Sequence, residues 1–427
     1  MRESRNLPNT RCVAPLFRDA LLLCSLLCAL SACQQDTLLL VSISGPPMQN
    51  MTAALTIGGK PLDPVQTLSG SETKFALLIP SGKFGSGELR VEGFQGNECV
   101  AARGSIPVQI TEGEQREVAV EVSALAAHEC QVDAATLTDL HGLSDKDIWA
   151  VGDFDSVLRW DGRRWNRMPS QPVGFVTGIW AERPDSILLS GGSLQRYDGK
   201  SFTPMQDPTT SAFYAVGGVP GSVWAVGALG SIVRYENGMW TDKDSLGQSW
   251  SQVLDSEKDP KQDSPILRDI AVTSDGGLWI SGDNGILLRW DSANKKWVRV
   301  NLNTKDTLRR IAVKNNDAWI GGTSGNLWRL SSGTWVKQTI SPAPTSVFDV
   351  FVQDSQTVCL AGAGGTLMSG TPMDTNSVKC TDRRFTTTNL YALWGSGQGD
   401  LWIAGGVRKG DSKLREDNVG YLYHLMP

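Results

Sequence analysis

The hydrophobic pattern in the second part of the chain repeats itself. A short run that is apolar on both faces and ends in glycine occurs in seven copies, and "DIWAVG" and "DAWIGG" are two of them. The copies end at Gly152, Gly191, Gly227, Gly282, Gly322, Gly362 and Gly405. Their spacings of 39, 36, 55, 40, 40 and 43 residues match the period of about 40 residues that is typical of β-propeller blades.

Each repeat has the same internal order of expected strands. An alternating strand such as "RDIAVTS" comes first, and the glycine-terminated strand follows it. A tight turn such as "GDNG" then leads to a third, alternating strand such as "SVLRWDG", which turns into a short fourth strand. A strand that is apolar on both faces must be covered on both sides, so each four-stranded sheet needs two neighbours. A closed ring of sheets provides them, and the sequence predicts a seven-bladed β-propeller over residues 131–427.

A tryptophan stands at the third position of the glycine-terminated strand in five copies. These residues are Trp149, Trp224, Trp279, Trp319 and Trp402, whereas the second copy has Leu188 and the sixth has Cys359. We expect the tryptophans to pack between blades, with ligand stacking as the alternative. The last copy ends after a third strand, so we expect residues near "HECQVDA" (128–134) to supply its outer strand. A three-stranded last blade is the alternative.

The region before the repeats has a different pattern. Period-2 alternation in "ELRVEGF" and "REVAVEV" is typical of half-buried strands. Together with "TLLLVSI", "MTAALTI", "KFALLIP" and "SIPVQI", these segments predict a small β-sandwich over residues 37–130. Its pattern resembles the immunoglobulin-like or transthyretin-like modules of bacterial surface proteins. All 15 tryptophans lie between Trp149 and Trp402, which places a domain boundary near residue 130 of this all-β chain.

The N-terminal segment has the features of a secretory signal. Four arginines precede the apolar run Ala20–Leu30, which is too short to cross a hydrocarbon core of about 30 Å. Leu30-Ser31-Ala32-Cys33 resembles the bacterial lipobox. The resemblance implies cleavage after residue 32, a diacylglyceryl group on the Cys33 thiol, and an acylated amino terminus at the start of a lipidated anchor (residues 33–36). Two chains anchor a protein stably in a bilayer. An ordinary signal peptide with an incidental Cys33 is the alternative.

The propeller region also resembles a known group. Its repeats follow "D-x-W-A-V-G-x-x-G-x-(I/L)-x-(H/R)-(W/Y)-x-G-x-x-W", a pattern common in lipoproteins of gliding and predatory proteobacteria. The resemblance implies an outer-membrane-type lipoprotein, and Gln34 after Cys33 favours the outer membrane by the enterobacterial rule. It implies nothing about the ligand, because one fold supports many functions.

Charge and cysteine content limit the function further. The net charge is −5, and it is −7 once the +2 of residues 1–32 is removed, which argues against nucleic-acid binding. Four cysteines remain after the anchor, an even number in an oxidising compartment. Neighbouring pairs, Cys99–Cys130 and Cys359–Cys380, are the simplest disulfides, with buried free thiols as the alternative. The sequence has no C-x-x-C motif.

Two charged insertions indicate where a partner binds. Residues 241–265 lengthen the connection between the third and fourth copies, and residues 405–420 lengthen the last turn. Insertions in repeat folds often collect on the functional face. We therefore expect a binding surface at these loops and at the mouth of the central channel, formed by Lys243, Trp250, Arg408, Lys409 and Lys413. Tolerated surface loops are the alternative.

Motifs for catalysis are absent from the sequence. It has three histidines and no G-x-S-x-G, H-E-x-x-H or P-loop motif, and we expect no cofactor and no metal. The favoured function is a non-catalytic platform, anchored in the lipid bilayer through Cys33, that binds an envelope protein or glycan. The alternative is a polysaccharide lyase or glycoside hydrolase. It would need acid and base groups in the channel, where His141, Arg268 and Asp269 are the candidates.

Overall fold

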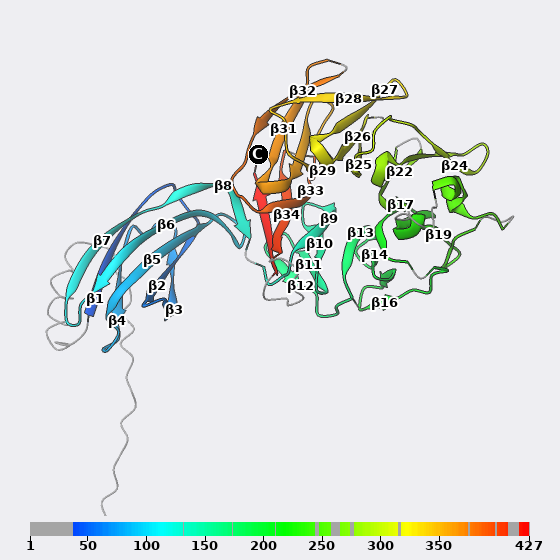
Figure 1. Ribbon diagram of the computed structural model, residues 1–427. Helices are drawn as coiled ribbons and strands as arrows, with labels where there is room; N and C mark the ends of the chain where they lie inside the picture. The colour runs from blue at the N-terminus through cyan, green and yellow to red at the C-terminus, as the bar shows by residue number, and fades with distance from the viewer. Residues whose placement is uncertain are drawn as a thin grey trace, which may run out of the picture. The chain divides into compact units, whose positions relative to one another are not determined.

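The computed structural model describes residues 37–426 except 131, 173, 210, 244–246, 258–264, 274–276, 315–316, 375, 398 and 409–417. The chain forms two compact units: one contains residues 37–92 and 104–123, and the other contains residues 93–103 and 124–426. Strands dominate both units (Figure 1). No helix in the described part of the chain is long and apolar enough to cross a membrane.

The first unit contains two groups of strands. One sheet has the order β4-β1-β7, and the other strands follow the order β3-β2-β5-β6. Their bounds are β1 (Thr37–Ser44), β2 (Asn50–Ile57), β3 (Lys60–Ser69), β4 (Lys74–Ile79), β5 (Gly85–Phe94), β6 (Cys99–Ile110) and β7 (Gln115–Glu121). The hydrophobic pattern does not predict β3, which contains Pro61 and Pro64. Among the strands of the unit it pairs only with β2, and an edge strand is where proline is tolerated in a sheet.

The second unit is built from four-stranded antiparallel sheets in which the strands follow chain order from the inside outward. The first strands are β9 (Leu137–Ser144), β13 (Val176–Arg183), β17 (Phe213–Val219), β21 (Leu267–Val272), β25 (Leu308–Lys314), β29 (Val347–Val352) and β33 (Asn389–Trp394). The second strands are β10 (Asp147–Gly152), β14 (Ser186–Gly191), β18 (Ser222–Gly227), β22 (Leu278–Gly282), β26 (Asp317–Gly322), β30 (Val358–Gly362) and β34 (Leu401–Arg408).

The outer half of each sheet contains the third and fourth strands. The third strands are β11 (Ser156–Trp160), β15 (Gln195–Tyr197), β19 (Ile232–Glu236), β23 (Leu287–Asp291), β27 (Leu327–Ser331), β31 (Leu367–Pro372) and β35 (Asn418–Leu425). The fourth strands are β12 (Trp165–Arg167), β16 (Phe202–Pro204), β20 (Met239–Thr241), β24 (Lys296–Arg299), β28 (Thr334–Ser341) and β32 (Ser377–Asp382). β28 and β32 also pair with each other in parallel.

The first strands form a closed circle. Each lies beside the first strand of the next sheet, and β33 lies beside β9. In Figure 1 these strands surround the centre of the unit and strands such as β12 and β16 lie outside. The predicted propeller architecture is therefore confirmed for this unit.

The glycines that end the second strands are required because a backbone carbonyl oxygen lies very close to each of them. A Cβ atom on Gly152 would lie 2.1 Å from the carbonyl oxygen of Thr136, and one on Gly362 would lie 1.9 Å from that of Ser346. Real Cβ contacts are not that short, so the first strand can begin against the end of the second strand only where the side chain is absent. This contact explains why every repeat ends in glycine.

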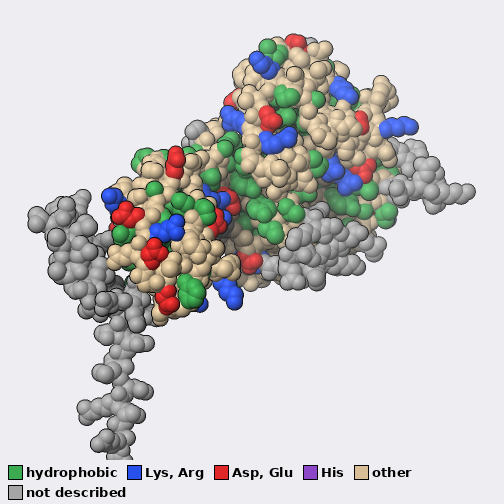
Figure 2. Space-filling model, turned by 60° about the vertical axis from the view of Figure 1, so that its left-hand side comes forward, with side chains coloured by type: hydrophobic (Ala, Val, Ile, Leu, Met, Phe, Trp, Pro, Cys, Tyr) green, Lys and Arg blue, Asp and Glu red, His purple; other side chains and the backbone are tan. Residues whose placement is uncertain are grey.

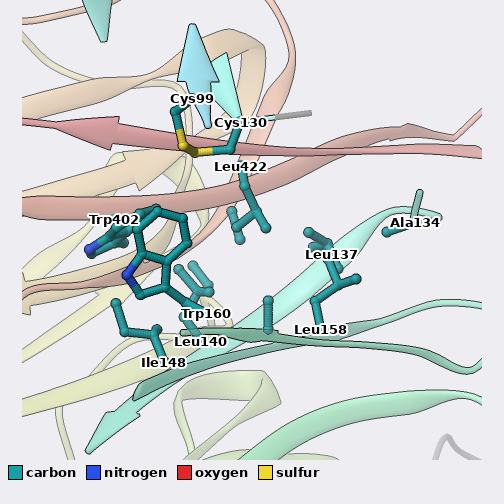
Figure 3. Packing of buried hydrophobic residues seen from close by; sticks show 13 residues of the cluster. Cys99, Cys130, Ala134, Leu137, Leu140, Ile148, Leu158, Trp160, Trp402 and Leu422 are labelled. Carbon is teal, nitrogen blue, oxygen red and sulfur yellow. A yellow bond between two sulfur atoms is a disulfide. The ribbon is translucent and has the colours of Figure 1, made fainter. Parts of the chain in front are cut away.

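The last sheet takes its outer strand from the region before the first repeat. β8 (Ser123–Cys130) pairs with β35, with Cys130 opposite Leu422, Glu129 opposite Tyr423 and His128 opposite His424. The expected closure by the segment around residue 128 is confirmed. Figure 3 shows the Cys99–Cys130 disulfide above Leu422, at the edge of the hydrophobic cluster that contains Trp160 and Trp402.

The two expected disulfides have different outcomes. Cys99 and Cys130 are bonded, as predicted. The pairing of Cys359 with Cys380 is wrong, because both are buried free thiols. Cys359 lies on β30 and Cys380 on β32, and β31 runs between these strands. Strands two places apart are separated by nearly 10 Å, whereas the Cα atoms of a disulfide lie within about 7 Å.

We predict that replacing Cys99 and Cys130 by serine destabilises the second unit by about 3 kcal/mol, because the cross-link restricts a loop of 31 residues in the unfolded chain. Denaturant unfolding followed by tryptophan fluorescence tests this, since every tryptophan lies in this unit. Cys359→Ser/Cys380→Ser is the matched control: it keeps the Cys99–Cys130 disulfide and should lose stability in reductant as the wild type does, whereas the variant without Cys99 and Cys130 should not respond to reductant. A wild type whose stability is the same with and without reductant would contradict the prediction.

Candidate functional site

The repeated tryptophans lie between adjacent sheets. Trp149, Trp224, Trp319 and Trp402 are almost fully buried, and Trp279 is buried as well. Each packs onto residues of the following sheet. Trp402, for example, has its ring centroid 4.6 Å from that of Trp160 and 5.5 Å from that of Trp165 (Figure 3). None of these five indoles is placed on the surface to stack with a ligand.

Trp250 is buried, so its expected place on an exposed binding surface is wrong. It begins the 3-10 helix η2 (Trp250–Glu257) and is 8% exposed. Its ring centroid lies 5.2 Å from that of Trp224 and 5.7 Å from that of Trp290. The Trp250 indole is part of the hydrophobic core. Burial of a large aromatic side chain away from water stabilises the folded protein more than exposure of that side chain.

The other predicted binding residues are only partly described. Lys243 is exposed, and its backbone pairs with Ser249. Arg408 is the last residue of β34, and its side chain is not described. Lys409, Lys413 and the predicted lipidation site Cys33 lie outside the described residues. The binding surface expected from these residues stays a prediction.

A β-bulge occurs at the same place in every first strand. The pairing of each first strand with its second strand skips one residue near the start. The skipped residues are Thr138, Thr177, Tyr214, Arg268, Arg309, Phe348 and Tyr391. A bulged residue leaves the ladder, and its side chain takes a new direction. The seven bulges therefore place one side chain from each first strand at one end of the ring.

Five of the bulged residues form a continuous arc, which we call the arginine–aromatic arc: Tyr214, Arg268, Arg309, Phe348 and Tyr391. The guanidinium carbon of Arg268 lies 5.1 Å from the Tyr214 ring centroid, and that of Arg309 lies 4.8 Å from the Phe348 ring centroid. Phe348 and Tyr391 stack with their centroids 5.3 Å apart. All five are half-buried. The two threonines that complete the circle donate their hydroxyl protons to backbone carbonyls.

The two arginines of the arc differ in their partners. Arg268 donates two hydrogen bonds to Asp283, at 2.8 and 2.6 Å. Arg309 has no acidic partner within the described part of the chain, and its buried Nε has no hydrogen-bond partner there. Burial and the nearby charge of Arg268 lower the pKa of Arg309, but a guanidinium stays charged at neutral pH. An unpaired cation beside an aromatic face is a site for a flat anion such as a carboxylate.

Buried charges also meet at the centre of the ring. Arg310 forms an ion pair with Asp139. It also pairs with Asp349 at 3.0 Å and with Asp269 at 3.6 Å. The carboxylates also accept hydrogen bonds from backbone N–H groups of the following first strands: Asp139 from Ile179, Asp269 from Ile311 and Asp349 from Leu393. Each carboxylate thus connects its own first strand to the next one.

The electrostatics of this cluster follow from burial and from an excess of acid. Burial raises the pKa of Asp269 to about 7 and that of Asp349 to about 6, against the opposing effect of Arg310. Burial by itself would lower the pKa of Arg310, but the three carboxylates raise it overall. One guanidinium compensates three carboxylates incompletely, so the cluster retains negative charge or binds a proton near neutral pH.

The candidate catalytic residues do not converge. Arg268, a residue of the arc, pairs with Asp283, whereas Asp269 forms its ion pair with Arg310. The carboxylate of Asp139, the acidic group nearest to His141, is occupied by Arg310 and two backbone N–H groups. Burial lowers the pKa of His141. These carboxylates hold strands together, and the geometry gives no free acid–base pair. No cluster that could hold a metal occurs within the described residues.

Both charged insertions connect to the end of the ring that carries the arc. The insertion of residues 241–265 precedes β21, which begins at Leu267, directly before the bulge at Arg268. β34 ends at Arg408, beyond the pair formed by Asn389 and Gly406 at the start of β33. On the face drawn in Figure 2, Lys and Arg side chains are interspersed with Asp and Glu. That face has no large area of one charge sign.

Comparison with solved structures supports the fold. A structure of YCF48 bound to D1 peptide is 15% identical, covers 71% of this chain and 97% of its own, and has a TM-score of 0.52. The WD40 propeller domain of Doa1 is 13% identical, with coverages of 70% and 96% and a TM-score of 0.53. A catalytically inactive virginiamycin B lyase from Staphylococcus aureus with quinupristin is 13% identical, with coverages of 70% and 99% and a TM-score of 0.54.

These similarities establish a β-propeller and no more, because each identity is low. No protein-family model matches the chain, and no curated protein matches it. The similar structures include binding propellers and a lyase, so the fold alone does not decide between binding and catalysis.

We predict that Arg310→Met destabilises the propeller by about 3–5 kcal/mol at pH 8, because three buried carboxylates lose their counter-charge. The folded-state pKa values of Asp269 and Asp349, which burial already raises, then rise further above the unfolded values. A folded pKa above the unfolded value lowers stability as pH rises, so the loss should be smaller at pH 5.

Denaturant unfolding at both pH values, followed by tryptophan fluorescence, measures this difference. Arg289→Met, at an exposed arginine on β23, is the control and should change stability little at either pH. A loss in Arg310→Met that is independent of pH would show that the arginine acts through packing and not through its charge.

Proposed function

We propose that this protein is a lipid-anchored β-propeller of the bacterial cell envelope that binds a partner without catalysing a reaction. The observation that carries the proposal is Arg309, a half-buried cation in the arginine–aromatic arc with no acidic partner within the described residues. Burial of an arginine without an anion is unfavourable in the free protein. An arriving carboxylate removes that penalty and forms charge-assisted hydrogen bonds.

The chemistry of the arc favours an acidic segment of an envelope protein or an acidic glycan. A carboxylate would pair with Arg309, and the stacked rings of Phe348 and Tyr391 would contact a planar or apolar group beside it. YCF48, a propeller of similar fold, has been solved with a peptide, which supports a peptide as the partner. The insertions at residues 241–265 and 405–420 would frame the site.

The location rests on the N-terminal sequence. Residues 1–32 have the features of a signal peptide, and the lipobox-like segment ends at Cys33. The Cys99–Cys130 disulfide supports an oxidising compartment. We propose an outer-membrane lipoprotein, with a β-sandwich between the anchor and a propeller of seven blades. The sheet order and the circle of first strands support the blade count, and the two groups of strands in the first unit support the sandwich.

We predict that Arg309→Gln weakens capture of the partner by at least about tenfold, because one charge-assisted interaction contributes about 1.5–3 kcal/mol. The measurement is a cross-linked pull-down from envelope extract of the source bacterium with the full-length protein, quantified by mass spectrometry. Arg289→Gln is the matched control and should capture the partner like the wild type.

The same pull-down identifies the chemistry of the partner. Competition by an excess of poly-glutamate peptide should release it, whereas an uncharged Gly-Ser peptide should not. Equal capture by Arg309→Gln and the wild type would move the site away from the arc.

We predict that Cys33→Ala abolishes lipidation, because the thiol is the acceptor of the diacylglyceryl group in the lipobox interpretation. Metabolic labelling with an alkyne-tagged palmitate, followed by gel fluorescence, should show a labelled wild type and an unlabelled variant. The variant should also leave the membrane fraction and appear in the soluble envelope fraction. Label that persists in Cys33→Ala would exclude Cys33 as the anchor.

A further inference from the structure

The repeats that lack the motif tryptophan leave cavities in the ring. One cavity, of about 380 Å³, is lined by Leu188 of the second repeat, and another, of about 310 Å³, is lined by Cys359 of the sixth. These are the two repeats in which another residue replaces the tryptophan. A volume of 380 Å³ lies within the usual range for small-molecule sites.

The comparison with the other repeats shows which space is open. The motif tryptophan normally packs onto an aromatic residue of the next sheet, as Trp149 does onto Tyr197 and Trp224 does onto Trp290. At the second repeat the next sheet still provides Tyr235, and Tyr235 lines the cavity together with Leu188. The walls that would hold an indole are present, and the indole is not.

The same repeat has also lost an acidic partner. In the first and fifth repeats an arginine of the third strand lies 5.0 Å from the tryptophan ring centroid, and it pairs with an aspartate two residues before that tryptophan. These sets are Arg159, Trp149 and Asp147, and Arg329, Trp319 and Asp317.

In the second repeat the strand register places Arg196 opposite Leu188, and Ser186 occupies the position of the aspartate. Arg196 therefore lacks both the ring and the carboxylate, and it has no ion pair within the described residues.

Two carboxylates also line the cavity, and both have other partners, although Arg183 beside Glu182 pairs more closely with Asp185, at 2.6 Å. Glu236 pairs with Arg234 at 2.6 Å. Glu182 accepts a hydrogen bond from the Ser186 hydroxyl at 3.2 Å and lies 3.8 Å from Arg183. The indole of Trp180 is fixed by its N–H, which donates to the Gly218 carbonyl. Arg196 is thus a cation with no ion pair among the described residues, in a cavity with two aromatic walls.

We propose that this cavity, the Leu188 pocket (Trp180, Leu188, Arg196, Val223 and Tyr235), binds a planar aromatic group that carries a carboxylate. The ring takes the place of the missing tryptophan, and the carboxylate takes the place of the missing aspartate on Arg196. The pocket is lined by Glu182 near the end of β13, whereas the arc lies near the starts of the first strands. The two sites are therefore at opposite ends of the ring, and this inference does not depend on the proposed function.

The test is isothermal titration calorimetry of the full-length protein with N-acetyltryptophan and with its amide. We expect the acid to bind with a dissociation constant of about 1 mM or lower. The amide should bind about tenfold more weakly, because it loses the charge of the carboxylate. Arg196→Met should bind the acid only as weakly as the amide. Equal binding of acid and amide to the wild type, or no binding of the acid at about 10 mM, overturns the proposal.

The decisive variant is Leu188→Trp, which restores the motif residue and fills the pocket. It should abolish binding and leave the thermal unfolding temperature unchanged or raised, since five other repeats carry tryptophan at this position. Cys359→Trp fills the other cavity and is the matched control, with binding retained. Binding that persists in a folded Leu188→Trp variant overturns the proposal. If Leu188→Trp does not fold, the Arg196→Met variant provides the test.

A peptide arm separates two sources of the same chemistry. Gly-Gly-Trp with a free carboxylate should bind at least as well as N-acetyltryptophan if the natural ligand is the C-terminal aromatic residue of a polypeptide. Weaker binding of the peptide assigns the pocket to a free aromatic acid.

Discussion

The propeller depends on sheets that are apolar on both faces. A second strand such as β10 is buried from Ile148 to Gly152, so its sheet is stable only between two others. The tryptophan of that strand fills the space to the following sheet, and truncation of a buried tryptophan in a core typically costs about 3–5 kcal/mol. The same requirement holds for the last sheet. A ring is the arrangement in which no sheet lacks a neighbour, and β8 completes the final sheet from a segment that precedes the first repeat.

Sequence reasoning was accurate where the pattern is local. The glycine-terminated strands, their turns and the fourth-strand connections follow from periodicity and turn residues, and the structure places β10, β14, β18 and β26 at the expected residues. It failed where contacts are long-range. β3 contains prolines that only an edge position tolerates, and Trp250 is buried by Trp224 and Trp290, which are distant from it in the sequence.

The arginine–aromatic arc was missed because the repeats were aligned on the second strand. Alignment on the first strands would have revealed one variable residue at each bulge: Thr138, Thr177, Tyr214, Arg268, Arg309, Phe348 and Tyr391. The sequence would still not have distinguished Arg268 from its neighbour Arg309. That difference arises because Asp283, in the turn after β22, reaches Arg268 and leaves Arg309 without a carboxylate. Charge compensation is a property of the folded chain.

The pairing of β8 with β35 also sets an order of folding. Cys130 and its partner Leu422 are separated by 292 residues of chain, and a chain emerges from the ribosome with its N-terminus first. β8 is therefore synthesised long before β35, and until β35 pairs with it the backbone groups along one edge of β8 have no partner strand. The first sheet is incomplete for the same time, because its face with Leu140, Ile148 and Trp160 packs against Trp402 and its neighbours in the last sheet. A chain that stops before residue 402 exposes an apolar sheet face and an open strand edge together, which is the combination that leads to aggregation.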